Sequence, residues 1–219
     1  MAHDWPLLRD LTDQDRRSIL QATTRRRFRK GDTVFHEGDL GDTFHLIDRG
    51  HVAVRVSTPA GDVATLTVLG AGDCFGEQAL LSPEHRRTAA IVALEPTETL
   101  VLHHREFDAL RAREPRVQAF LANVMALTVR RLSSQLLEAL YIPVDKRLLR
   151  RLNDLVSLYG DGSGPVTIPI TQEDLATMAG TTRPSANRLL KELADTDVVE
   201  LTRGRITVID PRSLDTRAR

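Results

Sequence analysis

The 219-residue sequence is poor in cysteine and aromatic residues and has no net charge. Its one cysteine excludes a disulfide within the chain and is typical of a protein in a reducing cytosol. Aromatic residues make up only 4% of the chain, so we expect an aliphatic core. The 30 basic and 30 acidic residues balance, so any nucleic-acid surface must come from the local placement of charge.

Targeting signals and catalytic motifs are also missing. No run approaches the roughly 18 apolar residues of a membrane span, and the opening MAHDWPLLRD lacks the apolar segment of a signal peptide. We therefore expect a cytoplasmic protein with no membrane partner. Neither a GxSxG, an HExxH nor a P-loop pattern occurs. The sequence thus predicts no catalytic residue, no metal site and no enzyme.

The first two thirds of the chain show two different sequence patterns. A short helix is expected over 12–22, and between about 27 and 103 short alternating apolar runs separated by glycine turns predict a compact antiparallel β barrel or roll. From about 105 to 140 the turn signals vanish and apolar residues recur at helical intervals. Roughly 25 helical residues after Pro115 would span about 37 Å, more than one small roll can cover. This helix could pack on the roll or pair with a second copy of the chain.

The stretch YIPVD, residues 141–145, ends this helix at a proline and predicts a hinge before a small second domain. There we expect a helix over about 145–159, a Gly-rich turn and the strand VTIPI. Helices over 172–178 and 183–194 follow, and then a strand pair joined at Arg203-Gly204. The final DTRAR is expected to fray.

Residues 170–195, ITQEDLATMAGTTRPSANRLLKELAD, have the spacing of a helix-turn-helix. Thr171 and Asp174 match a capping box, Gly180 suits the turn, Thr182 can cap the second helix, and Pro184 falls in its first turn. An apolar stripe is expected to be buried, which leaves the polar residues of the second helix on other faces. The candidate DNA-binding residues are Thr171, Thr182, Arg183, Pro184, Ser185, Asn187, Arg188 and Lys191.

Those basic residues could simply solvate an exposed helix face. The capped first helix, the glycine turn and the strand pair favour DNA reading instead, with Arg183 and Arg188 suited to the acceptors of guanine. Residues 144–219 contain twelve Lys/Arg against eleven Asp/Glu, a net charge of +1. Attraction to phosphate must therefore come from how these charges are arranged.

Three stretches together resemble the CRP/FNR family of bacterial transcription regulators over about residues 20–210: KGDTVFHEGDLGDTFHLIDRGHVAV, FGEQALLSPEHRRTAA and TQEDLATMAGTTRPSANRLLKEL. The resemblance implies an α+β chain. Its parts would be a cyclic-nucleotide-binding β-roll (a jelly roll) over 1–114, a dimerisation helix and hinge over 115–143, and a winged helix-turn-helix over 144–219. It also implies a homodimer that binds double-stranded DNA and RNA polymerase under allosteric control by a cyclic nucleotide.

In nucleotide-binding members of that family, the middle stretch is a phosphate-binding cassette. A glycine and the amides after it approach the cyclic phosphate, a glutamate takes the ribose 2′-hydroxyl, and an arginine ten residues later pairs with the phosphate. The residues of this chain that match are Gly76, Glu77, Gln78, Ala79, Arg87, Thr88 and Ala89. Arg86 is then expected to be a surface residue or a supporting charge.

The long helix would meet the base of the nucleotide. Leu132 and Ser133 stand where the cyclic-AMP-binding relative presents two hydroxyl residues, so Leu132 departs from the pattern, and Thr128 or Ser134 could supply the missing hydroxyl. Cyclic AMP is the default effector and cyclic GMP the second candidate, with no other cofactor implied. In the second helix of the helix-turn-helix, Pro184 replaces the family's glutamate. The target half-site is therefore expected to differ at one base pair from the best-known operator of the family.

Other interpretations stay open. Glu77 and Arg87 could form an internal ion pair in a roll that binds nothing, in a regulator that answers to another signal. A nucleotide-sequestering module or an enzyme is a remote alternative. Family branches that carry an iron–sulfur cluster need several cysteines, and Cys74 is more readily explained as a small buried residue beside Phe75 than as a haem ligand.

Overall fold

The computed structural model describes residues 12–82, 84–113 and 115–219, so the opening decapeptide lies outside the described residues. Two compact units make up this part of the chain. The roll unit contains residues 12–61 and 68–132, and the C-terminal unit contains 62–67 and 133–219. Antiparallel sheets and helices occur in both, which confirms the α+β class.

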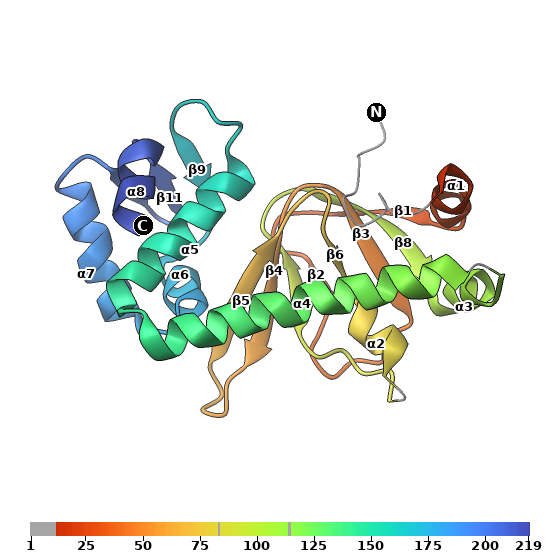
Figure 1. Ribbon diagram of the computed structural model, residues 1–219. Coiled ribbons are helices and arrows are strands. Elements are labelled where there is room, and N and C mark those ends of the chain that lie inside the picture. The colour runs from red at the N-terminus through yellow and green to blue at the C-terminus, as the bar shows by residue number, and fades with distance from the viewer. Residues whose placement is uncertain (1–11, 83, 114) are drawn as a thin grey trace. The chain divides into compact units, whose positions relative to one another are not determined.

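Two four-stranded sheets form the roll (Figure 1). One has the order β1-β8-β3-β6, and its strands are β1 (Thr24–Phe28), β8 (Thr97–His103), β3 (Thr43–Arg49) and β6 (Cys74–Phe75). The other has the order β2-β7-β4-β5, and its strands are β2 (Thr33–Phe35), β7 (Ala90–Ala93), β4 (Val52–Ser57) and β5 (Val63–Leu69). Pairing is antiparallel, as the alternating runs and glycine turns predict.

Four helices accompany the roll: α1 (Asp13–Gln21), α2 (Glu77–Leu81), α3 (His104–Arg113) and α4 (Pro115–Tyr141). They build a mostly aliphatic core with β3 and β8, in which Ile19 of α1, Phe107 of α3 and Val124 of α4 are all buried. β3 is buried at every position except its last, because it lies between two other strands and is covered by side chains on both faces. This strand therefore places side chains in the interior beneath α2.

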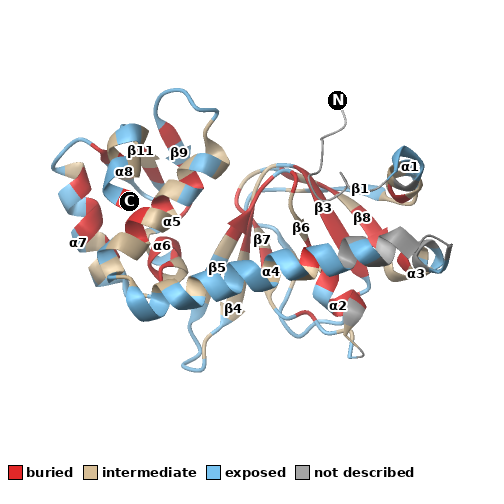
Figure 2. Cartoon of the chain, viewed as in Figure 1, coloured by how far each residue is buried: buried red, intermediate tan, exposed pale blue. Residues whose placement is uncertain are grey.

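The helix α4 is 27 residues long, and Figure 2 shows much of its described length as exposed. The exposed residues include a row of large apolar side chains. Its exposed members are Leu127, Val129, Leu132, Leu136, Leu137, Leu140 and Tyr141. Some of the apolar residues predicted at helical intervals have side chains that lie outside the described residues: Leu110, Val117, Phe120 and Leu121. Within the described ranges, no helix is both long and apolar enough to cross a membrane.

The C-terminal unit has the predicted elements in the predicted order, followed by one helix that was not predicted, α8. It contains α5 (Val144–Tyr159), β9 (Val166–Ile168), α6 (Gln172–Met178), α7 (Arg183–Ala194), β10 (Val199–Thr202), β11 (Arg205–Val208) and α8 (Pro211–Ala218). Its sheet has the order β10-β11-β9. The expected fraying of the C-terminus is wrong: Asp210 accepts hydrogen bonds from two amides of α8, and Leu214 and Ala218 are buried.

The predicted break at Pro143 is confirmed, because α4 ends at Tyr141 and Pro143 is the N-cap of α5. Arg147, one turn into α5, donates hydrogen bonds to the carbonyl oxygens of Ala139 and Ile142 at the end of α4. It also donates to the carbonyl oxygens of Ala179 and Gly180 between α6 and α7. One side chain thus links the end of the long helix to the turn of the helix-turn-helix.

Candidate functional site

Arg87 is a buried cation at the centre of the predicted cassette. Its side chain lies in the interior of the roll, and the residue is only 5% exposed. Nη1 donates to the carbonyl oxygens of Thr43 (2.8 Å) and Gly76 (3.1 Å), and Nη2 donates to Oγ1 of Thr43 (2.6 Å). The ring of Phe35 lies beneath the guanidinium, with its centroid 4.0 Å from Cζ. The group is therefore fixed in both position and orientation.

Two glycines make room for this guanidinium. Gly76 has φ 88°, a left-handed conformation, and a Cβ there would lie 2.7 Å from Arg87 Nη1. A Cβ at Gly41 would lie 2.5 Å from Arg87 Nε and 2.6 Å from Cβ of Ala79. Both distances are too short for any side chain, so glycine at these positions is a condition for burying Arg87.

The Nε atom of Arg87 is buried and has no hydrogen-bond partner among the described residues. Burial lowers the pKa of Arg87, and the carboxylates of Asp42, Asp39 and Glu77 act in the opposite direction. A buried, cationic N–H without an acceptor is costly, and an anion is the ligand that would satisfy it. This orphaned donor fits an anion-binding site.

Glu77 begins α2 directly after Gly76, and its residue is 9% exposed. Burial raises the pKa of the Glu77 carboxyl, while the charges of Arg131 and Arg87 lower it. In the described part of the chain no ion pair joins Glu77 to Arg87, because the guanidinium donates to Thr43 and Gly76 instead. The internal ion pair considered from the sequence is therefore not what the structure has.

The remaining cassette residues lie around the same point. Gln78 and Ala79 are in the first turn of α2, where N–H groups have no intrahelical acceptor. Thr88 Oγ1 donates to Gln78 Oε1 (2.9 Å), and both residues are exposed. Arg86 is exposed, as expected, and its Nη1 donates to the carbonyl oxygen of Gly38 (2.8 Å).

The three predicted base-contacting residues lie on α4. Thr128 is partly buried, and Leu132 and Ser133 are exposed. No hydrogen bond joins Thr128 or Leu132 to the cassette within the ranges that the structure describes, so their role stays a prediction. Arg131, which the sequence did not single out, lies close enough to lower the pKa of Glu77.

The helix-turn-helix begins with the predicted capping box. Thr171 Oγ1 accepts from the Asp174 amide (3.0 Å), and the Asp174 carboxylate accepts from the Thr171 amide (2.9 Å). Gly180 has φ 61° in the turn between the helices. Thr182 is the N-cap of α7, as predicted. Its side chain makes no hydrogen bond to the helix backbone, so the expectation that the side chain caps the helix is wrong. The hydroxyl of Thr182 lies 3.2 Å from that of Ser185 instead.

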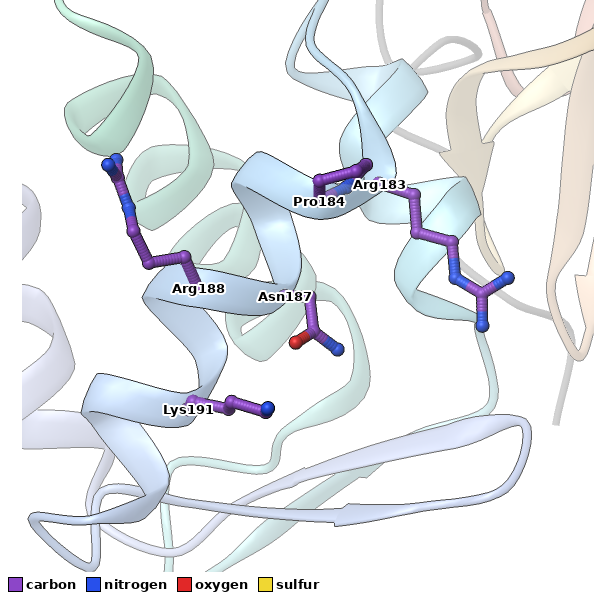
Figure 3. Close-up of a pocket in the computed structure, with 5 residues that line it drawn as sticks. All are labelled: Arg183, Pro184, Asn187, Arg188 and Lys191. Atoms are coloured by element: carbon purple, nitrogen blue, oxygen red, sulfur yellow. The ribbon is translucent and has the colours of Figure 1, made fainter.

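The outer surface of α7 carries the candidate DNA-binding side chains. Arg183, Pro184, Asn187, Arg188 and Lys191 line one open hollow (Figure 3). The apolar residues between them are buried, as the predicted stripe requires.

Two of the residues that line this hollow form hydrogen bonds with side chains on other helices. Asn187 Nδ2 donates to Gln172 Oε1 (2.7 Å) on α6. Arg188 Nη2 donates to Asp145 Oδ1 (3.1 Å) on α5, and Figure 3 shows Arg188 turned away from Asn187 and Lys191. Gln172 and Asp145 were not identified from the sequence, because neither lies on α7.

Comparisons with known proteins match two parts of the chain to two domain families. Residues 25–114 match the cyclic nucleotide-binding domain family, and residues 146–217 match the Crp-like helix-turn-helix domain family. The chain is 34% identical over 210 residues to the cyclic AMP receptor protein of Thermus thermophilus, covering 96% of this chain and 95% of that protein. It is 30% identical over 198 residues to the CRP-like cAMP-activated global transcriptional regulator of Mycobacterium tuberculosis, covering 88% and 87%.

Solved structures show the same fold. The catabolite activator protein of Thermus thermophilus matches with a TM-score of 0.55 at 35% identity, covering 97% of this chain and 98% of that one. The c-di-GMP responsive global regulator CLP of Xanthomonas campestris matches with a TM-score of 0.74 at 18% identity, covering 91% and 100%.

A cyclic-nucleotide-binding domain followed by a Crp-like helix-turn-helix defines the class: a DNA-binding transcription regulator. With the identity and coverage of the Thermus thermophilus relative, the chain belongs to the CRP/FNR family.

Proposed function

We propose that this chain is a cyclic-AMP-responsive regulator that binds a palindromic operator as a homodimer and has no catalytic activity. The observation that carries the effector proposal is the buried Arg87, whose Nε has no partner among the described residues. The choice of cyclic AMP rests on the relatives from Thermus thermophilus and Mycobacterium tuberculosis, both of which are named for it. A fold shared with a c-di-GMP responsive regulator does not by itself fix the effector.

The cassette offers a complementary group for each part of a cyclic nucleotide. Arg87 Nε and the N–H groups of Gln78 and Ala79 would face the cyclic phosphate, where the N-terminal end of α2 also favours negative charge. The Glu77 carboxylate would accept the ribose 2′-hydroxyl. Thr128, Leu132 and Ser133 of α4 would meet the base, with Leu132 replacing one hydroxyl by an apolar contact.

The exposed apolar row on α4 supports the dimer. Large aliphatic side chains at helical spacing on one long helix are what a second copy of the same helix would cover. A two-fold dimer would place two copies of α7 about 34 Å apart, the spacing of successive major grooves on one side of DNA. The effector would act by binding one of two dimer arrangements better than the other.

The recognition helix α7 would read the operator. Arg183 and Arg188 would donate to guanine, Asn187 would contact an adenine edge, and Lys191, Ser185, Thr182 and Thr171 would contact phosphates or neighbouring bases. Pro184 has no carboxylate to accept from cytosine, so we expect a half-site that differs there from that of the best-known family members. A regulator of this kind would act in the cytoplasm and contact RNA polymerase.

The test begins with an operator selected from random-sequence DNA by the purified full chain. Fluorescence anisotropy on the selected duplex is then measured with cyclic AMP, with cyclic GMP and without either. We expect tight binding that depends on cyclic AMP. Equal affinity in all three conditions would favour a regulator that answers to another signal, and no DNA binding in any condition would refute the proposed function.

A further inference from the structure

A chain of buried polar side chains runs from Arg87 into the interior of the roll. Thr43, His45 and Thr99 are 7%, 1% and 0% exposed, in a region otherwise filled by apolar residues. Thr43 Oγ1 lies 2.6 Å from Arg87 Nη2 and 3.2 Å from His45 Nε2. His45 Nδ1 lies 3.2 Å from Thr99 Oγ1. Each link is within hydrogen-bond distance, so the guanidinium is connected to a residue of β8 through β3.

The chemistry of these groups fixes the direction of one hydrogen bond and leaves two tautomers of His45 for the others. An arginine only donates, so Thr43 Oγ1 must accept from Arg87, and its hydroxyl hydrogen and second lone pair remain. With the hydrogen of neutral His45 on Nδ1, Thr43 donates to Nε2 and Nδ1 donates to Thr99 Oγ1; with the hydrogen on Nε2, Thr43 accepts from it and Thr99 donates to Nδ1. Neutral His45 therefore satisfies the whole chain in either tautomer.

The surroundings of His45 hold that state. Its ring stacks on Phe75 with centroids 4.7 Å apart and planes 15° apart, and Phe35, which also lies under Arg87, contacts it edge-on at 6.1 Å. Burial lowers the pKa of His45 to about 3, and the charges of Arg87, Arg26 and His103 act in the same direction. The imidazole is therefore neutral at physiological pH, and its ring plane is set by the stacking on Phe75.

This network also determines which donors of Arg87 remain. Nη1 and Nη2 both donate to Thr43, so the edge of the guanidinium between these two nitrogens is occupied. Nη1 also donates to the carbonyl oxygen of Gly76. The donors left over are Nε–H and the second hydrogen of Nη2. These two lie on one edge of the guanidinium and can hold two oxygens of a single phosphate.

We propose that Thr43 and His45 are positioning residues of the nucleotide site: His45 orients the Thr43 hydroxyl, and Thr43 turns the free edge of Arg87 toward the cyclic phosphate. The proposal rests on the proposed function of the roll. It explains why polar residues occupy interior positions of β3, where burial without hydrogen bonds would be costly and aliphatic side chains would pack as well.

The test is calorimetric titration of the full chain with cyclic AMP. Thr43→Val keeps the shape of the side chain and removes the hydroxyl, and His45→Phe keeps the stacked ring and removes both ring nitrogens that hydrogen-bond to Thr43 and Thr99. We expect each to weaken binding about tenfold, the effect of one lost hydrogen bond in an oriented charged site. Thr43→Ser restores the hydroxyl and is expected to bind within about twofold of the natural chain.

A double variant separates positioning from simple core damage. If His45 acts through Thr43, Thr43→Val with His45→Phe should bind no more weakly than Thr43→Val alone. Thr97→Val is the matched control, because Thr97 is equally buried but donates to the carbonyl oxygens of His51 and Glu95, away from Arg87. Thermal unfolding of every variant verifies that it is folded.

Each outcome decides one question. Three results would overturn the positioning role if the natural chain binds the nucleotide: no loss of affinity in Thr43→Val, additive losses in the double variant, or an equal loss in Thr97→Val. Each of them would leave the proposed function standing. Failure of the natural chain to bind cyclic AMP or cyclic GMP would overturn both.

Discussion

The adjacent arginines 86 and 87 offer a matched pair for testing the nucleotide site. The two side chains are chemically identical and neighbours in sequence, but Arg87 is buried under Gly76 and Arg86 is exposed. We expect Arg87→Ala to weaken cyclic AMP binding by about a hundredfold or more and Arg86→Ala to leave the affinity nearly unchanged.

The magnitude follows from the donors that each change removes. Arg87 has Nε–H and one Nη2 hydrogen left for a phosphate, and a hydrogen bond to a charged group contributes about 1.5–3 kcal/mol. Losing both costs about 3–6 kcal/mol, which is on the order of a hundredfold to ten-thousandfold in Kd. Arg86 donates only to the Gly38 carbonyl at the surface, so its loss should change Kd by less than about threefold.

The assay is isothermal titration calorimetry with cyclic AMP, and thermal unfolding serves as the control. Removing Arg87 leaves the carbonyl oxygens of Thr43 and Gly76 without this donor, so some loss of stability is expected as well. Arg87→Lys keeps a positive charge and most of the aliphatic stem but not the planar fork, and we expect an intermediate loss of about tenfold or more. Equal losses in both alanine variants, or a larger loss in Arg86→Ala, would refute the assignment of the phosphate to Arg87.

Three further predictions concern other parts of the chain. Leu136→Glu places a charge in the exposed apolar row of α4, so it should convert a dimer to a monomer in light scattering after gel filtration; a persisting dimer would contradict the pairing of α4. Asp145→Asn releases Arg188 from an exposed ion pair and should raise DNA affinity about two- to fivefold by anisotropy; the same gain in Asp215→Asn, on α8, would show a non-specific charge effect. Cys74 is half-buried, and desolvation together with the charges of Glu77 and Asp73 raises the pKa of its thiol well above its usual value. Alkylation at pH 8 should therefore be slower in the folded chain than after denaturation, and equal rates would contradict this shift.

Elements with local signals could be predicted from the sequence almost residue for residue. The capping box at Thr171 and Asp174, the turn at Gly180 and the break at Pro143 each act within one or two turns of the chain. The same kind of signal was present for α8 and was missed: Asp210 followed by Pro211 is a typical helix start. The short, polar sequence after it carries only two buried residues, too few to show a helical stripe.

The candidate site could be predicted only where the motif is continuous. Glu77 and Arg87 belong to one stretch, so their spacing identified them together. Thr43, Gly41 and Phe35 come more than thirty residues earlier, and they reach Arg87 because the end of β2, the start of β3 and the loop between them meet at its guanidinium. Thr182 shows the opposite limit: its position as an N-cap followed from the sequence, but the choice of Ser185 as its partner depends on side-chain geometry.

The close fit of Arg87 against Gly41 and Gly76 also has an evolutionary consequence. A Cβ at either glycine would also lie too close to a second group, Ala79 Cβ (2.6 Å) at Gly41 and the Thr43 carbonyl oxygen (2.7 Å) at Gly76, so loss of the arginine alone releases neither position. We therefore expect descendants of this gene that lose anion binding to lose Arg87 first, while Gly41 and Gly76 persist. Alignments of such descendants would then distinguish rolls that still bind an anion from rolls that have become purely structural, before any ligand is tested.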